Sequence, residues 1–320
     1  KPLTFKGVTI YQAAFEDGGS QLDLLVWNLN SSQPSFQMNS EIFKNNEVIF
    51  ERQKLTFEFN DFRNFNILEI TQNDEQKPIP TNVGPNFLYK VRNESGQAKE
   101  YQTYQLPIII ENKYFFMSGM RNSPQEEFKY LKIPADQNLS IEGFMILKSL
   151  LNDPKKVENA INKGIKESAF KTIEQKEAFE LGTKNVIRAF IKGGYDSVIS
   201  DMDFNVPQEA STLDKEKAIK TYINIIFLIS QELLREYKEN NKDKMIFPEN
   251  DFPRFIQDAL TAYSDSFFYG IPLYLELKDF KHVQASGLQL TKSPGKVWVY
   301  LGSILLVLGI FCMIYIQEIR

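Results

Sequence analysis

The end of the chain contains the feature that most limits its possible folds. Residues 297–316 are all apolar, aromatic, Gly, Ser or Cys. A helix of about 20 such residues crosses the hydrocarbon core of a bilayer, whereas a core helix of a soluble domain usually carries some polar residues. Trp298 near one end and Tyr315 near the other suit the two membrane interfaces. The sequence therefore predicts one transmembrane helix here.

The start of the chain and the charges near its end bear on topology. The sequence begins at Lys1 without methionine and already alternates like a strand in KPLTFKGVTIYQ, so we expect a fragment of a longer protein. Lys292 and Lys296 precede the apolar run, and Arg320 follows it. Counted alone, these charges place the body of the chain in the cytoplasm, but spans upstream of Lys1 would override so short a count.

The composition excludes several classes of protein. Of the 320 residues, 42% are hydrophobic, which is enough to bury a substantial core. The 37 basic and 41 acidic residues are not gathered in blocks, so nucleic acid is not an expected partner. The single cysteine, Cys312, lies in the apolar run and excludes an internal disulfide or a CxxC redox pair.

Residues 1–137 have the pattern of a strand-rich domain. Short runs rich in Val, Ile, Phe and Tyr include VTIYQAAF, LDLLVWNL, EVIFERQKLTFEFNDF, NFLYKVRN and KYFFMSGM. Segments with turn-forming residues, such as EDGGS and NESGQ, separate them. This pattern predicts antiparallel sheets in a sandwich or an open barrel.

The periodicity becomes helical in residues 138–266. Asn138 or Ser140 can cap a first helix, and a second is expected over residues 173–192, ending at a Gly-Gly pair. A third helix follows Leu213, and its apolar centre is too short to span a bilayer, so we expect a core helix, with a helix that lies against the membrane or a partner as the alternative. These residues are therefore predicted to form a helical insertion.

Residues 267–292 alternate again and predict a return strand and a juxtamembrane segment before the apolar run. The whole chain is thus predicted to be a mixed β+α protein. An antiparallel β-rich extracytoplasmic domain contains the helical insertion and is followed by one transmembrane helix.

The sequence contains little that would support catalysis. Its one histidine is His282, and neither a GxSxG elbow nor an HExxH helix occurs. Asp201 and Asp203 could begin an oxygen-ligand metal site, but a solvated turn is favoured because no third acidic ligand follows at a useful spacing. We therefore expect no catalytic residue and no metal site in this chain.

His282 is the one residue with coordinating chemistry close to the predicted membrane helix. Imidazole is a common axial ligand of haem iron, so His282 is a candidate haem ligand. The alternative is a surface histidine among Lys278, Lys281 and other polar neighbours. The residues alone leave both interpretations open.

Three stretches of the chain form a recognisable set: KPLTFKGVTIYQAAFEDGGS, NVGPNFLYKVRNESGQAKEYQTYQLPI and ASGLQLTKSPGKVWVYLGSILLVLGIF. Together they resemble the ResB-like family of system II cytochrome c biogenesis. The resemblance is strongest at the two ends and weakest near residues 150–265. It implies a bacterial inner-membrane protein with several earlier spans, a periplasmic body formed here by residues 1–296, and a last span that returns to the cytoplasm.

The same resemblance implies a division of labour. A ResC-type (CcsA-type) partner carries the haem-handling segment, and the pair moves haem across the membrane and joins its vinyl groups to the CxxCH thiols of apocytochrome c. The ResB-like subunit is expected to bind the apocytochrome and assist haem delivery without catalysing a step alone. No position here matches the haem-ligating histidines of the family, so the candidate role of His282 depends on its chemistry.

Two other functions stay open. A membrane-anchored β-rich envelope scaffold or binding domain, unrelated to haem, would have the same anchor and the same sheets. A membrane-tethered hydrolase is disfavoured by the single histidine.

Overall fold

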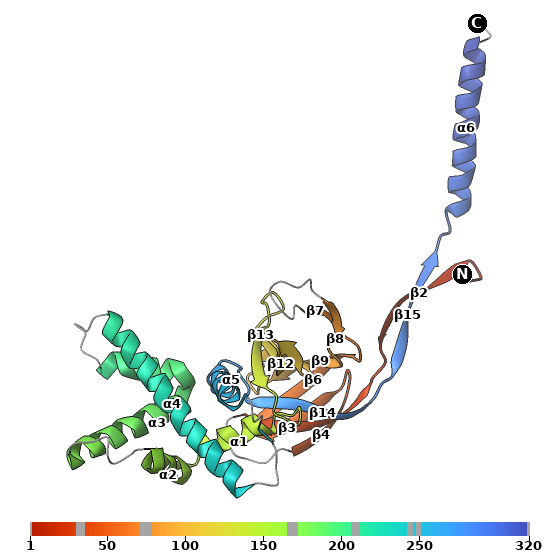
Figure 1. The fold of residues 1–320 in the computed structure, drawn as a ribbon. Helices are drawn as coiled ribbons and strands as arrows, with labels where there is room; N and C mark the ends of the chain where they lie inside the picture. Colours follow the sequence, from red (N-terminus) through yellow and green to blue (C-terminus); the bar gives the residue numbers. More distant parts are fainter. Residues whose placement is uncertain are drawn as a thin grey trace. The chain divides into compact units, whose positions relative to one another are not determined.

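The computed structural model divides the chain into two compact units. The described residues are 2–29, 36–70, 79–164, 172–205, 212–241, 246–247 and 251–318. One unit is Gly19–His282, and the other consists of Lys1–Gly18 together with Val283–Arg320. Both contain antiparallel strands, and the chain ends in a long apolar helix (Figure 1). The predicted mixed β+α fold is confirmed.

A seven-stranded antiparallel sheet is the largest sheet of the first unit. Its strands follow the order β11-β12-β10-β9-β6-β5, with β13 beside β12, and they curve into a half-barrel (Figure 1). The strands are β5 (Asn45–Phe50), β6 (Gln53–Arg63), β9 (Asn86–Arg92), β10 (Ala98–Tyr104), β11 (Ile108–Ile110), β12 (Lys113–Arg121) and β13 (Lys129–Pro134). In β6, the buried Leu55, Phe57 and Phe59 alternate with less buried residues, as a sheet with one face on the core requires.

The predicted run EVIFERQKLTFEFNDF is two strands in the structure, β5 and β6. Glu51 and Arg52 form the turn between them, and their φ angles are 49° and 68°. A two-residue turn with both φ angles positive has the twist that suits a hairpin. Because Asn and Gly usually occupy such turns, composition did not mark this one.

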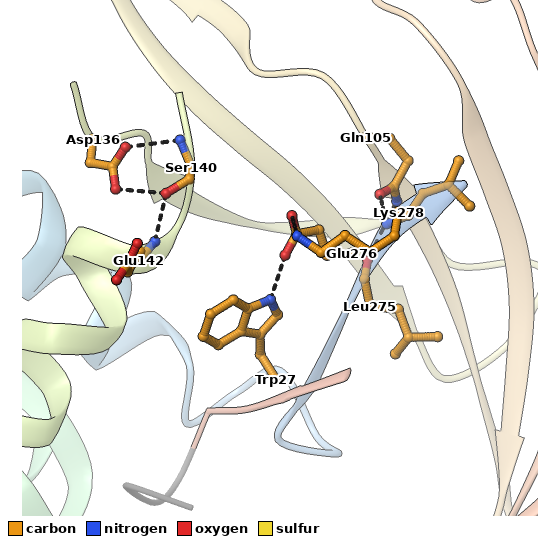
Figure 2. A network of polar contacts seen from close by, with 9 residues as sticks. Trp27, Gln105, Asp136, Ser140, Glu142, Leu275, Glu276 and Lys278 are labelled. Carbon is orange, nitrogen blue, oxygen red and sulfur yellow. Dashed lines mark hydrogen bonds and ion pairs between the residues drawn. The ribbon is translucent and has the colours of Figure 1, made fainter. Parts of the chain in front are cut away.

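A three-stranded sheet joins distant parts of the chain in the order β14-β3-β4. Its strands are β3 (Gln21–Asn28), β4 (Phe36–Glu41) and β14 (Leu273–Lys281). The side chain of Gln105 accepts a hydrogen bond from the Leu277 N–H at 2.7 Å and donates one to the Leu275 carbonyl at 3.4 Å (Figure 2). Gln105 is the residue directly after β10, so its side chain links β14 to the half-barrel through the same kind of backbone hydrogen bonds that a neighbouring strand would form. The described part of this unit also contains a separate antiparallel pair, β7 (Ile67–Ile70) and β8 (Ile79–Asn82).

Within the described residues, five helices lie between β13 and β14 in the chain. They are α1 (Glu142–Leu151), α2 (Pro154–Gly164), α3 (Ile173–Asn205), α4 (Thr212–Asn240) and α5 (Phe252–Asp265). Helix α5 packs against β13, and the helices pack against one another. One continuous hydrophobic core extends from the sheets into the helices, and its large buried side chains include Phe57, Tyr89, Phe144, Phe190 and Tyr263. The helical insertion and the sheets therefore share a core.

The second helix begins at Ile173, and its helical backbone ends at Gly193 and Gly194 as predicted; a further helical segment continues from this break to Asn205, and the two segments together form α3. Gly193 and Gly194 form a kink inside it, with φ of 67° at Gly194. The N–H of Tyr195 donates to Ser264 Oγ at 3.0 Å, which satisfies a backbone group that the kink releases from the helix. The segment SDMDF lies in this continued helix and not in the expected turn.

The start of α1 is organised by the carboxylate of Asp136, which is not one of the two caps expected from the sequence. Ser140, one of the two predicted caps, accepts a hydrogen bond from the Glu142 N–H at 3.2 Å (Figure 2). The buried carboxylate of Asp136 accepts from the N–H groups of Ser140 at 2.9 Å and Gly143 at 3.0 Å. Asp136 therefore satisfies orphan donors at the helix start and also holds the cap in place.

The second unit consists of a strand ribbon and the terminal helix. Strands β1 (Leu3–Phe5), β2 (Val8–Asp17) and β15 (Gln284–Lys292) form an antiparallel sheet in the order β1-β2-β15. Helix α6 (Lys296–Glu318) follows β15. Its part Lys296–Tyr315 is long and apolar enough to cross a membrane, and none of it is buried within the structure. This helix contains the predicted span at 297–316.

Candidate functional site

Two strand edges border a cleft in the unit Gly19–His282. Within the described ranges, β5 pairs only with β6, and β4 pairs only with β3. The cleft has a volume of about 530 Å³. Its lining comes from β3, β4, β5, β14 and the turn after β4, and consists of Gln21, Leu22, Asp23, Asn39, Ser40, Glu41, Lys44, Asn45, Asn46, Asp279, Phe280 and Lys281. Because a strand edge offers a row of backbone N–H and C=O groups, the cleft adjoins two templates for another chain.

The pairing of the β5–β6 hairpin determines which residues of β5 point outward. Phe50 flanks the two-residue turn, so Phe50 and every second residue before it bond to β6. The N–H and C=O groups of Ile49 and Glu47 therefore point toward the open edge. Lys54, opposite Ile49, agrees with this pattern, because its N–H points away from β5 and donates to the Glu94 carboxylate at 3.1 Å.

Strand β4 presents its edge toward β5. The side-chain amide of Asn46 donates to the Asn39 carbonyl at 2.6 Å, so this carbonyl points away from β3. The turn between the strands borders the cleft, where Lys44 donates its backbone N–H to the Glu41 carbonyl at 3.0 Å and places Nζ 2.6 Å from the Glu41 carboxylate. The two strands follow each other in the chain but belong to different sheets, which leaves space between their edges.

The lining of the cleft is polar and carries both charges. Asp279 lies opposite Asp23, and Lys281 lies opposite Gln21. Two carboxylates that face each other across a strand pair disfavour the free sheet and favour a cationic or hydrogen-bonding ligand. A haem macrocycle needs a largely apolar slot, and this lining does not provide one. The cleft therefore suits a polypeptide, and we assign no haem-dependent step to it.

His282 is the last residue of the same unit. Its Nδ1 lies 3.0 Å from Ser20 Oγ, and its half-buried ring lies 5.8 Å from the ring of Phe62. Phe62 also contacts Phe280, which lines the cleft, at a ring distance of 5.0 Å. A hydrogen bond at one ring nitrogen orients an imidazole, as in many metal-binding histidines. The role of His282 as a haem ligand stays a prediction.

Two large pKa shifts lie outside the cleft, in the core. Burial raises the pKa of Tyr269 to about 12 and lowers the pKa of Lys148 to about 7. Shifted groups are common in catalytic sites, but these two side chains are 0% and 2% exposed, so a dissolved substrate does not reach them. Within the described residues, no three His, Cys, Asp or Glu side chains are placed to hold a metal ion.

The residues of the two strand edges were not found from the sequence. Asn39, Asn46 and Ile49 belong to no motif, and their importance follows from the strand order. One signal was local: the turn at Glu51 and Arg52 makes β5 one arm of a hairpin, although the run EVIFERQKLTFEFNDF has no typical turn residue at this point.

Comparison with known proteins gives one match. The family model described as the ResB-like family matches residues 1–320. No curated protein and no solved structure matches the chain. The family match covers the helical insertion as well as both ends.

Proposed function

The chain belongs to the ResB-like family, which acts in cytochrome c biogenesis, and from this premise we propose that it binds unfolded apocytochrome c at the open edges of β4 and β5. The single observation that carries the proposal is the polar cleft on β14, β3 and β4, which reaches the start of β5 at Asn45 and Asn46 and so adjoins the open edges of β4 and β5. In this proposal the unit Gly19–His282 lies in the periplasm, and α6 anchors the chain in the inner membrane.

Strand edges suit an unfolded substrate for a physical reason. An extended chain that adds to a sheet edge forms backbone hydrogen bonds, which depend little on its sequence. Asn45–Ile49 spans about 16 Å at the usual rise per residue, and a five-residue CxxCH motif in extended form is about as long. Backbone pairing would therefore hold this motif and tolerate different flanking residues.

The polar lining supports the same substrate. Unfolded segments carry mixed charges and backbone groups that bond to water instead of to protein, and the carboxylates, lysines and amides of the cleft can replace that water. Asn46 already bonds to the Asn39 carbonyl, so an arriving strand would displace or extend this contact. The cleft would thereby reduce the freedom of the CxxCH segment before haem arrives.

The proposed subunit contributes proximity to the reaction. Thioether formation needs the haem vinyl groups and the cysteine thiols close together, and holding one reactant in place lowers the entropic barrier. In this proposal a ResC-type membrane protein supplies the haem, and this chain positions the apocytochrome. Such a subunit requires no nucleophile or general base of its own.

A proline substitution at Ile49, which lies on the open edge of β5 beyond the cleft-lining Asn45 and Asn46, tests the edge. Ile49→Pro removes an outward N–H without removing a bond to β6, whereas Ile49→Ala removes only the side chain. We expect Ile49→Pro to weaken the binding of a reduced CxxCH peptide about 10-fold, because each lost or obstructed backbone hydrogen bond is worth about 1 kcal/mol. The measurement is fluorescence anisotropy of the labelled peptide with the whole chain in nanodiscs.

The control variant decides the interpretation. Ile49→Ala should bind the peptide within about two-fold of the unchanged chain, since its edge N–H remains. In cells, a haem stain of denatured membrane proteins should lose covalently haem-bearing bands with Ile49→Pro and keep them with Ile49→Ala. Unchanged peptide binding by Ile49→Pro in a folded chain would contradict the proposed edge.

A further inference from the structure

The ribbon of the second unit has one apolar face. Cross-strand partners share a face, and the register aligns Leu3, Ile10 and Leu290 in one row. The next row aligns Phe5 with Val8 and, at the end of β15, with Lys292. The side chains of Leu3, Phe5 and Leu290 are 65%, 64% and 66% exposed. Large apolar side chains thus cover one side of β1, β2 and β15 without being buried in the protein.

The opposite face of the same ribbon is polar. Thr4, Thr9 and Thr291 form a row there, and the Oγ1 atoms of Thr4 and Thr9 lie 3.4 Å apart. Gln289 lies opposite Tyr11 on this face. Along β15, the apolar Leu288 and Leu290 therefore alternate with Gln289 and Thr291, as in a sheet between water and an apolar phase.

Continuity with α6 identifies the apolar phase. Only Ser293, Pro294 and Gly295 separate the end of β15 from the start of α6, which can span a membrane. Leu290 lies two residues before the end of β15, about 7 Å along the strand. Its row partners on β1 and β2 lie at the same end of the ribbon. The most apolar part of the ribbon is therefore the part nearest to the membrane-spanning helix in the chain.

The charges at this end favour a lipid surface. Lys6 lies in the turn between β1 and β2, and Lys292 and Lys296 flank the connection to α6. Residues 2–15 and 286–317 contain no Asp or Glu. The whole chain has a net charge of -4, so this end is locally basic in an acidic protein. Lysines beside an exposed apolar surface are typical of proteins that contact anionic headgroups.

We propose that the β1-β2-β15 ribbon lies in the headgroup region of the bilayer that α6 crosses. Its apolar face, defined by Leu3, Phe5, Leu288 and Leu290, contacts the acyl boundary, and Lys6 with its basic neighbours contacts lipid phosphates. The ribbon is thus a second membrane contact beside the spanning helix. It restricts the tilt of the chain at the membrane surface.

Neighbouring positions on one strand provide a matched test. Cys312 is the only cysteine, so Cys312→Ser allows single labels to be placed with Leu288→Cys, Gln289→Cys, Leu290→Cys or Thr291→Cys. The whole chain is placed in nanodiscs that contain phosphatidylglycerol, and each site carries a nitroxide. Its collisions with oxygen, which concentrates in lipid, and with a water-soluble nickel complex are then measured.

The expected result is an alternation along β15. The ratio of oxygen to nickel collisions should be at least about three-fold higher at positions 288 and 290 than at 289 and 291, because successive side chains point to opposite faces. Equal ratios with ready access to nickel at all four positions would place the ribbon in water and overturn the proposal. Low access to both reagents at 288 and 290 would show a protein partner on this face and would also overturn it.

The lysines are tested with the same labels. Lys6→Gln combined with Lys292→Gln should reduce the alternation in phosphatidylglycerol nanodiscs and leave the smaller alternation in phosphatidylcholine unchanged. Equal effects in the two lipids would remove the headgroup contact from the proposal. Binding of the CxxCH peptide by the same samples reports on the separate cleft, so failure there does not affect this result.

Discussion

Lys148 is a charged side chain in the core, and replacing it should stabilise the protein in a pH-dependent way. It lies in α1 and is 2% exposed. Its Nζ donates to Ser266 Oγ at 2.9 Å and lies 4.5 Å from the ring centroid of Tyr263. Burial lowers the pKa of Lys148 from 10.5 to about 7, and desolvation is the cause. The folded protein therefore disfavours the charged form of this lysine.

The size of the effect follows from the pKa. A change from 10.5 to about 7 corresponds to a destabilisation of the folded state by about 5 kcal/mol. The whole of this destabilisation is present below pH 7, where the amine is protonated in both the folded and the unfolded state. Between pH 7 and 10.5 only the unfolded chain keeps the proton. Unfolding then takes up a proton, so the free energy of unfolding rises by up to about 1.4 kcal/mol per pH unit.

Lys148→Met removes the charge and keeps an unbranched side chain. Ser266 Oγ still donates to the Tyr263 carbonyl at 2.7 Å, so the variant does not leave this hydroxyl without a partner. The lost hydrogen bond and ring contact offset part of the gain, each by about 1 kcal/mol. We expect Lys148→Met to be more stable than the unchanged chain at pH 6, and about 3 kcal/mol of this advantage to disappear by pH 9.5.

Urea unfolding at several pH values measures this difference. In a Trp298→Phe background, the fluorescence of Trp27 reports on the sheet, where its Nε1 donates to Glu276 at 2.7 Å (Figure 2). Trp27 packs on the same core as Tyr263, the residue whose ring lies beside Lys148. Burial raises the pKa of the Tyr263 phenol to about 12, so this group does not titrate between pH 6 and 9.5. A difference between the two proteins that stays constant from pH 6 to 9.5 would refute the reasoning.

Three further predictions concern single side chains. Asp136→Ala should lower the free energy of unfolding by about 3 kcal/mol in urea titrations, because a buried carboxylate that accepts several backbone hydrogen bonds is lost; a loss under 1 kcal/mol would contradict its capping role. Gly270→Ala should destabilise more than Gly96→Ala, since both have positive φ but only the Cβ at Gly270 would meet the hydroxyl of the buried Tyr101, at 3.0 Å; equal melting temperatures would refute this. If His282 is a haem ligand, the purified chain should show a Soret absorbance that His282→Ala abolishes, and an unchanged spectrum would exclude that role.

Several features of the fold follow from local sequence. The run at 297–316 predicts a spanning helix because length and apolarity are properties of consecutive residues. The alternation in β6 likewise predicts a strand with one buried face. The Gly193-Gly194 pair likewise predicts the helix end at 192, but the close continuation of a second helical segment depends on tertiary structure, because the Ser264 hydroxyl, about 70 residues away, accepts the N–H released at the kink.

The cleft was decided by tertiary structure alone. β14 pairs with β3 across most of the chain, and β4 and β5 separate into different sheets although three residues join them. Likewise, Ser20 and His282 meet although 262 positions separate them. The sequence by itself determined which segments are strands, which are helices and which residues can cross a membrane. Which strand edges remain open depends on pairing between distant segments, and local residue patterns do not encode that pairing.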